Sequence, residues 1–213
     1  MKLIKKLLKK FSFFVNRIPF NNSVRKGRKN KIVCKALMLK CRIRIKGTNN
    51  AIFISKNAML RKSKITIIGN DNVVNIGETV RIINGDIYLQ NDKNLVEIGT
   101  GTNICGKTHL ACIEGKRIQI GKDCLFSSEI VFRTGDSHSI YNFNNERINP
   151  SDDIIIGDKV WIGYRVLINK GVAIPNDCIV GTGAVVTKKF ETPNAVIAGV
   201  PAKIVKEKIK WSV

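Results

Sequence analysis

The sequence predicts an all-β solenoid of stacked triangular coils, and three observations predict it. Over residues 154–190 a branched aliphatic residue recurs every six positions, at Ile156, Ile162, Ile168, Ile174, Val180 and Val186. Farther upstream, isoleucine recurs every 22 positions, at Ile32, Ile54, Ile76, Ile98 and Ile120. The composition is 44% hydrophobic but only 7% aromatic, which suits a narrow interior filled by aliphatic side chains.

The period of six matches neither an α-helix, which repeats near 3.6 residues, nor a flat strand, which repeats every two. Four residues after each aliphatic position comes a mostly small or medium side chain: Val160, Val166, Val172, Cys178, Ala184 and Phe190. We interpret each unit as one inward strand residue followed by a corner. Three units then make a triangular coil, and successive coils stack by strand pairing about 4.8 Å apart. An ordinary half-buried strand does not continue this far without a cluster of turn residues.

The 22-residue period predicts the same coils with a short loop added at one corner. Four positions after the isoleucines stand Ala36, Ala58, Val80, Thr102 and Cys124, and six positions after them stand Met38, Leu60, Ile82, Ile104 and Phe126. Segments rich in Asn and Gly, which favour turns, precede the isoleucines at residues 47–50, 69–72 and 91–94. We predict one elongated β-helix domain over residues 32–207, with its largest insertion at 133–153 and a tail at 208–213.

The amino-terminal segment predicts a different element. Apolar residues with helical spacing alternate with lysines in residues 1–20, which indicates a basic amphipathic helix ending before Pro19, followed by a basic linker over 21–31. Residues 1–70 contain 20 Lys or Arg and no carboxylate, so most of the net charge of +21 lies at one end. Residues 2–16 therefore suit peripheral contact with an anionic membrane or another polyanion. The alternative is a helix that caps the solenoid, with its lysines solvated.

Several classes of protein are disfavoured. No stacking platform or groove-reading helix accompanies the positive charge, which argues against nucleic acid as a partner. Lysines interrupt the first apolar residues, and no apolar run is long enough to span a bilayer, so we expect a cytoplasmic protein. The six cysteines lack the spacing of metal sites, and we expect free, mostly buried thiols and no bound metal; Cys124 and Cys178 occupy inward corner positions.

The chain has only two histidines, so a general base that titrates near neutral pH has two candidates. His138 lies in "RTGDSHSIYN", within the one large insertion, and a loop on a rigid scaffold is a common place for a catalytic group. His109 lies in "KTHLACIEG" at an outward strand position, where a surface or structural role is the default. No serine nucleophile motif or Cys–His pair is present at a recognisable spacing, which disfavours covalent catalysis.

The segments "TGDSH", "IIIGDKVWIG", "GVAIPNDCIVGTGAVVTKKF" and "IAGVPAKIV" resemble those of the hexapeptide-repeat acetyltransferases with a left-handed parallel β-helix. The resemblance covers residues 98–207 well and is strongest toward the bacterial polysaccharide O-acetyltransferases, which are related to the maltose and galactoside enzymes. It implies a left-handed coil, a homotrimer and acetyl-CoA as co-substrate. It says little about the acceptor.

The resemblance also implies roles for individual residues. His138 matches the family's general base, and Trp161 matches a tryptophan implicated in catalysis, which would shape the thioester end of the coenzyme tunnel. Coenzyme A would lie in the groove between two subunits. Its contact positions correspond to Tyr164, Thr182, Thr187, Lys188, Lys203 and Lys206. His109 aligns with an acceptor-contacting position that is asparagine in the galactoside enzymes.

These features together predict an acetyl-CoA-dependent O-acetyltransferase that modifies a bacterial surface polysaccharide, such as an anionic or sialic acid-containing capsule, at the inner face of the plasma membrane. Two alternatives stay open at this point. One is a non-catalytic β-helix scaffold that binds polyanions through its basic end. The other is an N-acetyltransferase of nucleotide-linked amino sugars, which would have little use for so many basic residues at one end.

Overall fold

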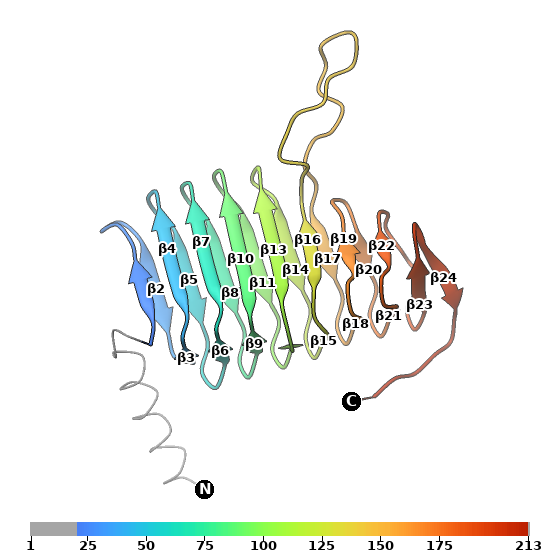
Figure 1. Cartoon of the computed structure of the whole chain (residues 1–213), viewed down its shortest axis with the longest axis horizontal. Helices are drawn as coiled ribbons and strands as arrows, with labels where there is room; N and C mark the ends of the chain where they lie inside the picture. The colour runs from blue at the N-terminus through green and yellow to red at the C-terminus, as the bar shows by residue number, and fades with distance from the viewer. Residues whose placement is uncertain (1–20, 213) are drawn as a thin grey trace, which may run out of the picture.

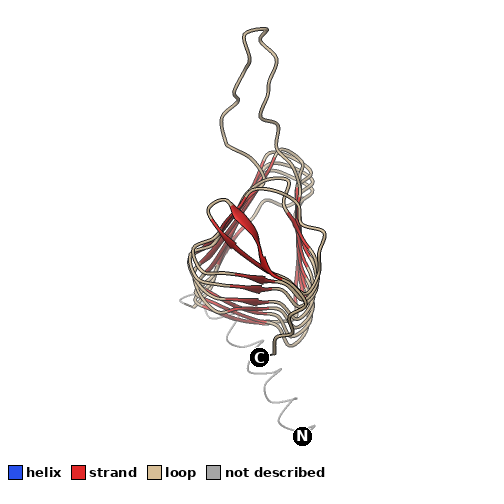
Figure 2. Ribbon diagram, turned by 90° about the vertical axis from the view of Figure 1, so that its right-hand side faces the viewer, coloured by secondary structure: helices blue, strands red, loops and turns tan. Residues whose placement is uncertain are grey.

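The computed structural model describes residues 21–212, which form a three-sided prism of stacked coils (Figures 1 and 2). The predicted helix over residues 1–20 lies outside the described residues. One hairpin-shaped segment projects far from the prism, and it corresponds to the predicted insertion (Figure 1). The all-β solenoid predicted from the six-residue period is therefore confirmed.

Each side of the prism is one sheet. Sheet A contains β1 (Ser23–Arg25), β4 (Arg42–Lys46), β7 (Lys64–Ile68), β10 (Gly85–Gln90), β13 (Thr108–Ile113), β16 (Ile130–Arg133), β19 (Leu167–Ile168) and β22 (Val185–Val186). Sheet B contains β2 (Lys31–Cys34), β5 (Ala51–Ile54), β8 (Val73–Ile76), β11 (Leu95–Ile98), β14 (Arg117–Ile120), β17 (Ile154–Ile156) and β20 (Ala173–Ile174).

Sheet C contains β3 (Leu37–Leu39), β6 (Met59–Arg61), β9 (Arg81–Ile83), β12 (Asn103–Ile104), β15 (Leu125–Phe126), β18 (Trp161–Ile162), β21 (Ile179–Val180), β23 (Val196–Gly199) and β24 (Ala202–Lys206). Neighbouring strands are parallel, except that β24 pairs antiparallel with β23 at the carboxyl-terminal end. The chain visits the sheets in the order A, B, C, so the corner between sheets A and B lies opposite sheet C.

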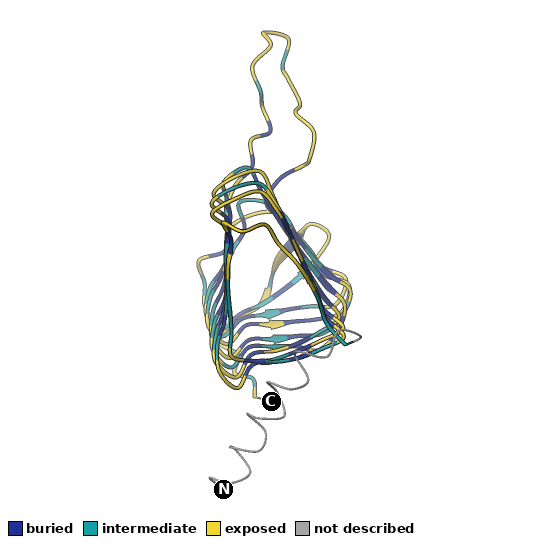
Figure 3. Ribbon diagram, turned by 90° about the vertical axis from the view of Figure 1, so that its left-hand side faces the viewer, coloured by how far each residue is buried: buried dark blue, intermediate teal, exposed yellow. Residues whose placement is uncertain are grey.

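The core is a continuous column of mostly aliphatic side chains inside the prism. Buried residues recur along the sides of the prism (Figure 3). The six aliphatic residues of the six-residue repeat are at most 2% exposed. Ile156 pairs with Ile174 and Ile162 pairs with Val180, which confirms a coil of eighteen residues for this part of the chain. Each coil covers the apolar layer of its neighbour, so a large core forms without a globular interior.

The 22-residue coils are also present, with one correction at the first. Ile54, Ile76, Ile98 and Ile120 stack in register as predicted. Ile32, however, pairs with Ile52, and Cys34 occupies the position next to Ile54. The reason is a shorter corner, since two residues, 35–36, join β2 to β3, whereas four residues, 55–58, join β5 to β6.

The structure also differs from the predicted linker over 21–31. Ser23–Arg25 form β1, which pairs with β4, and the Ser23 amide donates to the Cys41 carbonyl oxygen at 2.9 Å. Sheet A thus begins inside that segment, because pairing with β4 satisfies backbone groups that a free linker would leave to water. Within residues 21–212 no helix has the length and hydropathy that crossing a bilayer requires.

A ladder of buried asparagines holds the corner between sheets A and B. Asn30, Asn50, Asn72 and Asn94 stack one above another. The Oδ1 atom of each of the first three accepts hydrogen bonds from the backbone amide and the side-chain Nδ2 of the next asparagine, at 2.8–3.0 Å. The turn segments at 47–50, 69–72 and 91–94 are therefore the outward loops predicted from the 22-residue period.

Candidate active site

The projecting hairpin spans residues 134–153, between β16 and β17, at the same corner where shorter turns join the other coils. Its two arms are linked at the base, where the Asp152 amide donates to the Thr134 carbonyl oxygen at 2.8 Å, and again where the Ile148 amide donates to the Ile140 carbonyl oxygen at 2.9 Å. Thr134 is fully buried, and its Oγ1 accepts from the Ile113 amide at 2.9 Å. The hairpin is thereby anchored to sheet A.

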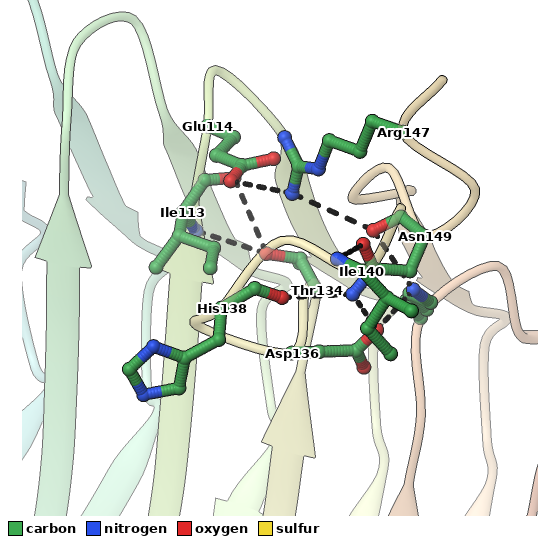
Figure 4. A network of polar contacts seen from close by, with 9 residues as sticks. Ile113, Glu114, Thr134, Asp136, His138, Ile140, Arg147 and Asn149 are labelled. Carbon is green, nitrogen blue, oxygen red and sulfur yellow. Dashed lines mark hydrogen bonds and ion pairs between the residues drawn. The ribbon is translucent and has the colours of Figure 1, made fainter. Parts of the chain in front are cut away.

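His138 lies on the first arm of this hairpin and is exposed. Asn149 on the returning arm fixes its backbone: the Asn149 Nδ2 donates to the His138 carbonyl oxygen at 2.8 Å and to Asp136 Oδ2 at 2.9 Å, while the Asn149 Oδ1 accepts from the Ile140 amide at 2.6 Å (Figure 4). The imidazole points away from this cluster (Figure 4). The segment that carries the imidazole is therefore held in place, while the ring itself is free to meet a ligand.

Two ion pairs tie the hairpin to the prism. Lys170 donates to Asp136, and this contact, together with the Asn149 hydrogen bond, holds the pKa of Asp136 below its usual value. Arg147 donates to Glu114 Oε1 at 2.9 Å and lowers the pKa of that carboxyl group in the same way. Both carboxylates are ionised near neutral pH, so both contacts are present there.

Four carboxylates in the hairpin are close enough in sequence to be candidates for orienting His138, and each has another partner. Asp136 contacts Lys170, Glu146 Oε2 accepts from Asn142 at 2.8 Å, Asp153 pairs with Arg117, and Asp152 Oδ1 accepts from the Asp153 amide. Across the described part of the chain, no carboxylate contacts the His138 imidazole.

A pocket of about 270 Å³ lies on the outer face of sheet A, beside the first arm of the hairpin. Ala111 lies between Tyr88 and Arg133 in strand register and forms part of its lining. Arg133 also donates to Ser137 Oγ at 3.3 Å, next to His138 in the chain. A guanidinium group and a tyrosine beside a strand surface suit an anionic sugar, since the guanidinium binds carboxylates and the ring offers a stacking face.

His109 lines this pocket, and its contact with an acceptor stays a prediction. Its Nδ1 lies 3.4 Å from Asp86 Oδ2, and its ring stacks on Tyr88 with centroids 6.4 Å apart. The contact with His109 is the main cause that lowers the pKa of Asp86, and Lys64, 3.5 Å away, adds to it. Nδ1 is thus engaged, which directs Nε2 toward other partners.

Sequence reasoning missed Asp86, Tyr88, Arg133 and Asn149. Asp86 and His109 are 23 positions apart, so a strict 22-residue period pairs Asp86 with Thr108 instead. The register shifts by one because three residues, 105–107, lie between Ile104 and Thr108, whereas two, 83–84, lie between their strand partners Ile82 and Gly85. Only the alternation of polar residues along β10, at Asp86, Tyr88 and Gln90, signals an outward face in the sequence.

Trp161 lies on the opposite side of the prism from His138. It points outward from β18 of sheet C, is 39% exposed, and packs against Trp211 of the tail with ring centroids 6.1 Å apart. The Trp211 Nε1 donates to the Lys159 carbonyl oxygen at 3.1 Å. Since His138 stands on the corner opposite sheet C, one chain does not bring these two residues together.

The six predicted coenzyme contacts divide between two places. Tyr164 and Thr182 share the corner between sheets C and A, where the Gly183 amide donates to the Tyr164 carbonyl oxygen at 2.8 Å. Lys203 and Lys206 lie on β24, opposite Ala198 and Val196 of β23. Because β23 pairs with β21, Lys203 lies near the coil that contains Thr182. The other two, Thr187 and Lys188, follow β22 and are exposed at the corner from which the hairpin projects.

The cysteines of the described residues are free, and Cys124 and Cys178 are buried as predicted from their corner positions. Burial raises the pKa of Cys112 to about 12 and that of Cys124 to about 11, which makes both thiols poor nucleophiles near neutral pH. Within residues 21–212 no group of three His, Cys, Asp or Glu side chains is placed to hold a metal ion.

We compared the chain and its fold with known proteins. No family model matches the chain. The crystal structure of a polysialic acid O-acetyltransferase superposes with a TM-score of 0.84 at 38% identity, covering 90% of this chain and 91% of that one. That of a polysialic acid-specific acetyltransferase superposes with a TM-score of 0.83 at 29% identity, covering 91% of this chain and 83% of that one.

Among curated proteins, a polysialic acid O-acetyltransferase of Neisseria meningitidis is 38% identical over 107 residues, which are 50% of each chain. The matches span about half or less of the length of the first curated relatives. The three-sided coil, the hairpin that carries His138 and the similarity to a solved structure over nine-tenths of the chain all point to the same family. The chain belongs to the hexapeptide-repeat acetyltransferases with a left-handed β-helix.

Proposed function

We propose that this protein is an acetyl-CoA-dependent O-acetyltransferase that transfers an acetyl group to a hydroxyl of a bacterial surface polysaccharide bearing carboxylates. The observation that carries the proposal is the anchored hairpin that holds His138 next to a pocket lined by Arg133 and Tyr88. The similarity to polysialic acid O-acetyltransferases supports the same class of acceptor.

In the proposed reaction, the His138 imidazole accepts the proton of an acceptor hydroxyl as that oxygen attacks the thioester carbonyl carbon. The tetrahedral intermediate then collapses, the carbon–sulfur bond breaks, and the thiolate of coenzyme A leaves and takes up a proton from the imidazolium. The exposure of the ring supports this role, because the base must come within about 3 Å of the hydroxyl. The free thiols play no part in this direct transfer.

The proposal is tested by acetyl transfer to a panel of polysaccharides, with the new ester located by mass spectrometry. His138→Ala is expected to reduce transfer by about 10²–10⁴-fold, which is the usual contribution of a general base, without changing the thermal stability. Retention of turnover by this variant would remove His138 from the base role. Calorimetry with coenzyme A tests the non-catalytic scaffold directly, since a scaffold would not bind it.

We further propose that the active site is completed between copies of the chain, in a homotrimer. His138 projects from one corner while Trp161, on the same coil, lies on the opposite face, and the two lines of proposed coenzyme contacts are also on different corners. In a threefold assembly, the hairpin of one subunit can lie beside the groove of the next.

Complementation distinguishes a shared site from one contained in a single chain. His138→Ala and Trp161→Ala chains are each expected to be nearly inactive alone. Mixed at random in one trimer, about one interface in four would combine an intact histidine with an intact tryptophan. Recovery of roughly this fraction of activity supports the shared site, and absence of recovery in demonstrably mixed trimers contradicts it.

For location, we propose peripheral binding to the inner face of the plasma membrane through residues 2–16. Their lysines and apolar residues support it, because each lysine near an anionic surface contributes about 1 kcal/mol. Deletion of residues 2–16 is expected to reduce sedimentation with anionic liposomes and to leave activity on a soluble acceptor unchanged. Unaltered liposome binding would assign this segment a structural role.

A further inference from the structure

The outer face of the first three strands of sheet A carries a set of basic residues without carboxylates between them. We call this set the basic track, and it consists of Arg25 on β1, Arg42, Arg44 and Lys46 on β4, and Lys64 on β7. All five are exposed. They alternate with inward residues along their strands, so they lie on one side of one sheet.

The strand register places like charges directly opposite one another. Arg25 pairs with Arg44, and Arg42 pairs with Lys64. Such pairs of like charges directly opposite one another are unfavourable in a sheet. Lys64 pairs with Asp86 at the edge of the track, whereas no carboxylate within residues 21–212 contacts the other four. An external anion would relieve this repulsion.

The basic track leads into the pocket beside His138. One row of outward positions runs from Arg42 through Lys64 and Asp86 to His109, and a second runs from Arg44 through Thr66 and Tyr88 to Ala111. With about 4.8 Å between neighbouring strands, β1 lies about 14 Å from β10, at the pocket. A chain molecule with one residue in the pocket would therefore continue over the track.

The other two faces of the same coils differ. Outward positions of sheet B over β2, β5 and β8 carry one basic residue, Lys31, and neutral residues such as Phe53 and Asn75. Sheet C has Arg61 and Arg81, but apolar residues such as Leu37 and Met59 surround them. Positive charge is thus concentrated on the face that also carries the pocket, and a membrane lying against this face would block the pocket.

We propose that the basic track is an extended subsite that binds consecutive carboxylate-bearing sugar residues of the acceptor polysaccharide, beyond the residue in the pocket. This inference rests on the proposed function and extends it. The protein thereby prefers long anionic chains to short ones, because several weak ion pairs act on one molecule. Short acceptors occupy the pocket alone and do not reach Arg25.

The test compares two triple variants of the full chain. The track variant carries Arg25→Gln, Arg42→Gln and Arg44→Gln, none of which lines the pocket. The matched control carries Lys35→Gln, Arg61→Gln and Arg81→Gln, which removes the same charge from exposed positions elsewhere on these coils. Binding is measured by calorimetry with polysialic acid, hyaluronate and polygalacturonate, in long and short forms, with dextran as the neutral polymer.

The track variant is expected to bind the preferred long polymer about tenfold more weakly than the unaltered chain, with less dependence on salt, while the control binds normally. Binding of short forms and their acetylation are expected to stay unchanged. Equal losses of affinity for the long polymer in both variants, or no loss in either, would overturn the proposal that the track binds the polysaccharide. So would an unaltered chain that binds none of the anionic polymers.

Separate readouts distinguish failure of the track from failure of the proposed function. Acetyl transfer by the unaltered chain tests the enzyme, whereas the ratio of long-chain to short-chain binding tests the track. If the track variant loses binding to anionic liposomes but keeps its affinity for every polymer, the face binds a membrane and the polysaccharide subsite is wrong.

Discussion

Asn149 donates a hydrogen bond from Nδ2 to the backbone carbonyl oxygen of His138, at 2.8 Å. Its Oδ1 meanwhile accepts from the Ile140 amide, two residues farther along the same arm. One side chain on the returning arm therefore fixes the backbone from His138 to Ile140. Because the proposed role of His138 as base requires its placement to within a fraction of an ångström, we infer that Asn149 is a positioning residue for this proposed reaction.

Asn149→Ala is expected to lower kcat by about 10–100-fold while KM for acetyl-CoA changes little, because it displaces the His138 backbone and leaves the coenzyme contacts intact. Asn149→Asp keeps the acceptor for Ile140 but loses the donors, so it should behave similarly. Steady-state kinetics and limited proteolysis of the hairpin measure the effect. Asn144→Ala, at the exposed tip, is the control, and an equal loss there would contradict the assignment.

The ion pair between Asp136 and Lys170 predicts how the hairpin base responds to acid. The folded pKa of Asp136 is lowered, so the stabilisation is complete above the unfolded value of about 3.9 and is lost as the pH falls through the folded value. Hydrogen exchange within residues 134–153, corrected for intrinsic rates, is expected to stay slow at pH 5 and to accelerate below about pH 4. Asp136→Asn should reduce this acceleration, and the Glu114–Arg147 pair accounts for what remains.

His109 and Asp86 are expected to position the acceptor. His109→Gln should raise KM for the polysaccharide about five- to tenfold and lower kcat less than threefold, because it removes a pocket contact worth about 1 kcal/mol. Kinetics at saturating acetyl-CoA, beside His138→Ala, separate the two histidines. A fall in kcat as large as that of His138→Ala would show that His109 takes part in the proton transfer.

The asparagine ladder is expected to contribute strongly to stability. Asn72→Ala removes the acceptor of the Asn94 backbone amide and one of the two donors to Asn50 Oδ1 inside a buried corner, at a cost of about 1–3 kcal/mol. Thermal unfolding followed by circular dichroism should show a lower Tm. Asn103→Ala, on the outer face of sheet C, should change Tm little, and a comparable loss there would contradict the ladder's special role.

The sequence by itself determined the coil. Its six-residue period fixes which side chains point inward, since one aliphatic residue per side is the only arrangement that fills a narrow triangular interior. The 22-residue spacing located the corner loops, and the break after Phe132 located the hairpin. The prediction that His138 is the general base followed from its place in that insertion and from the family resemblance.

The tertiary structure decided what those residues meet. Corner lengths change by one or two residues between coils, and these changes pair Asp86 with His109 and Cys34 with Ile54. A strict sequence period does not predict such shifts. Asn149, Arg133 and the basic track acquire their roles only through contacts between residues distant in sequence. The opposite placement of His138 and Trp161 likewise follows from the order of the three sheets, which exists only after the chain has coiled.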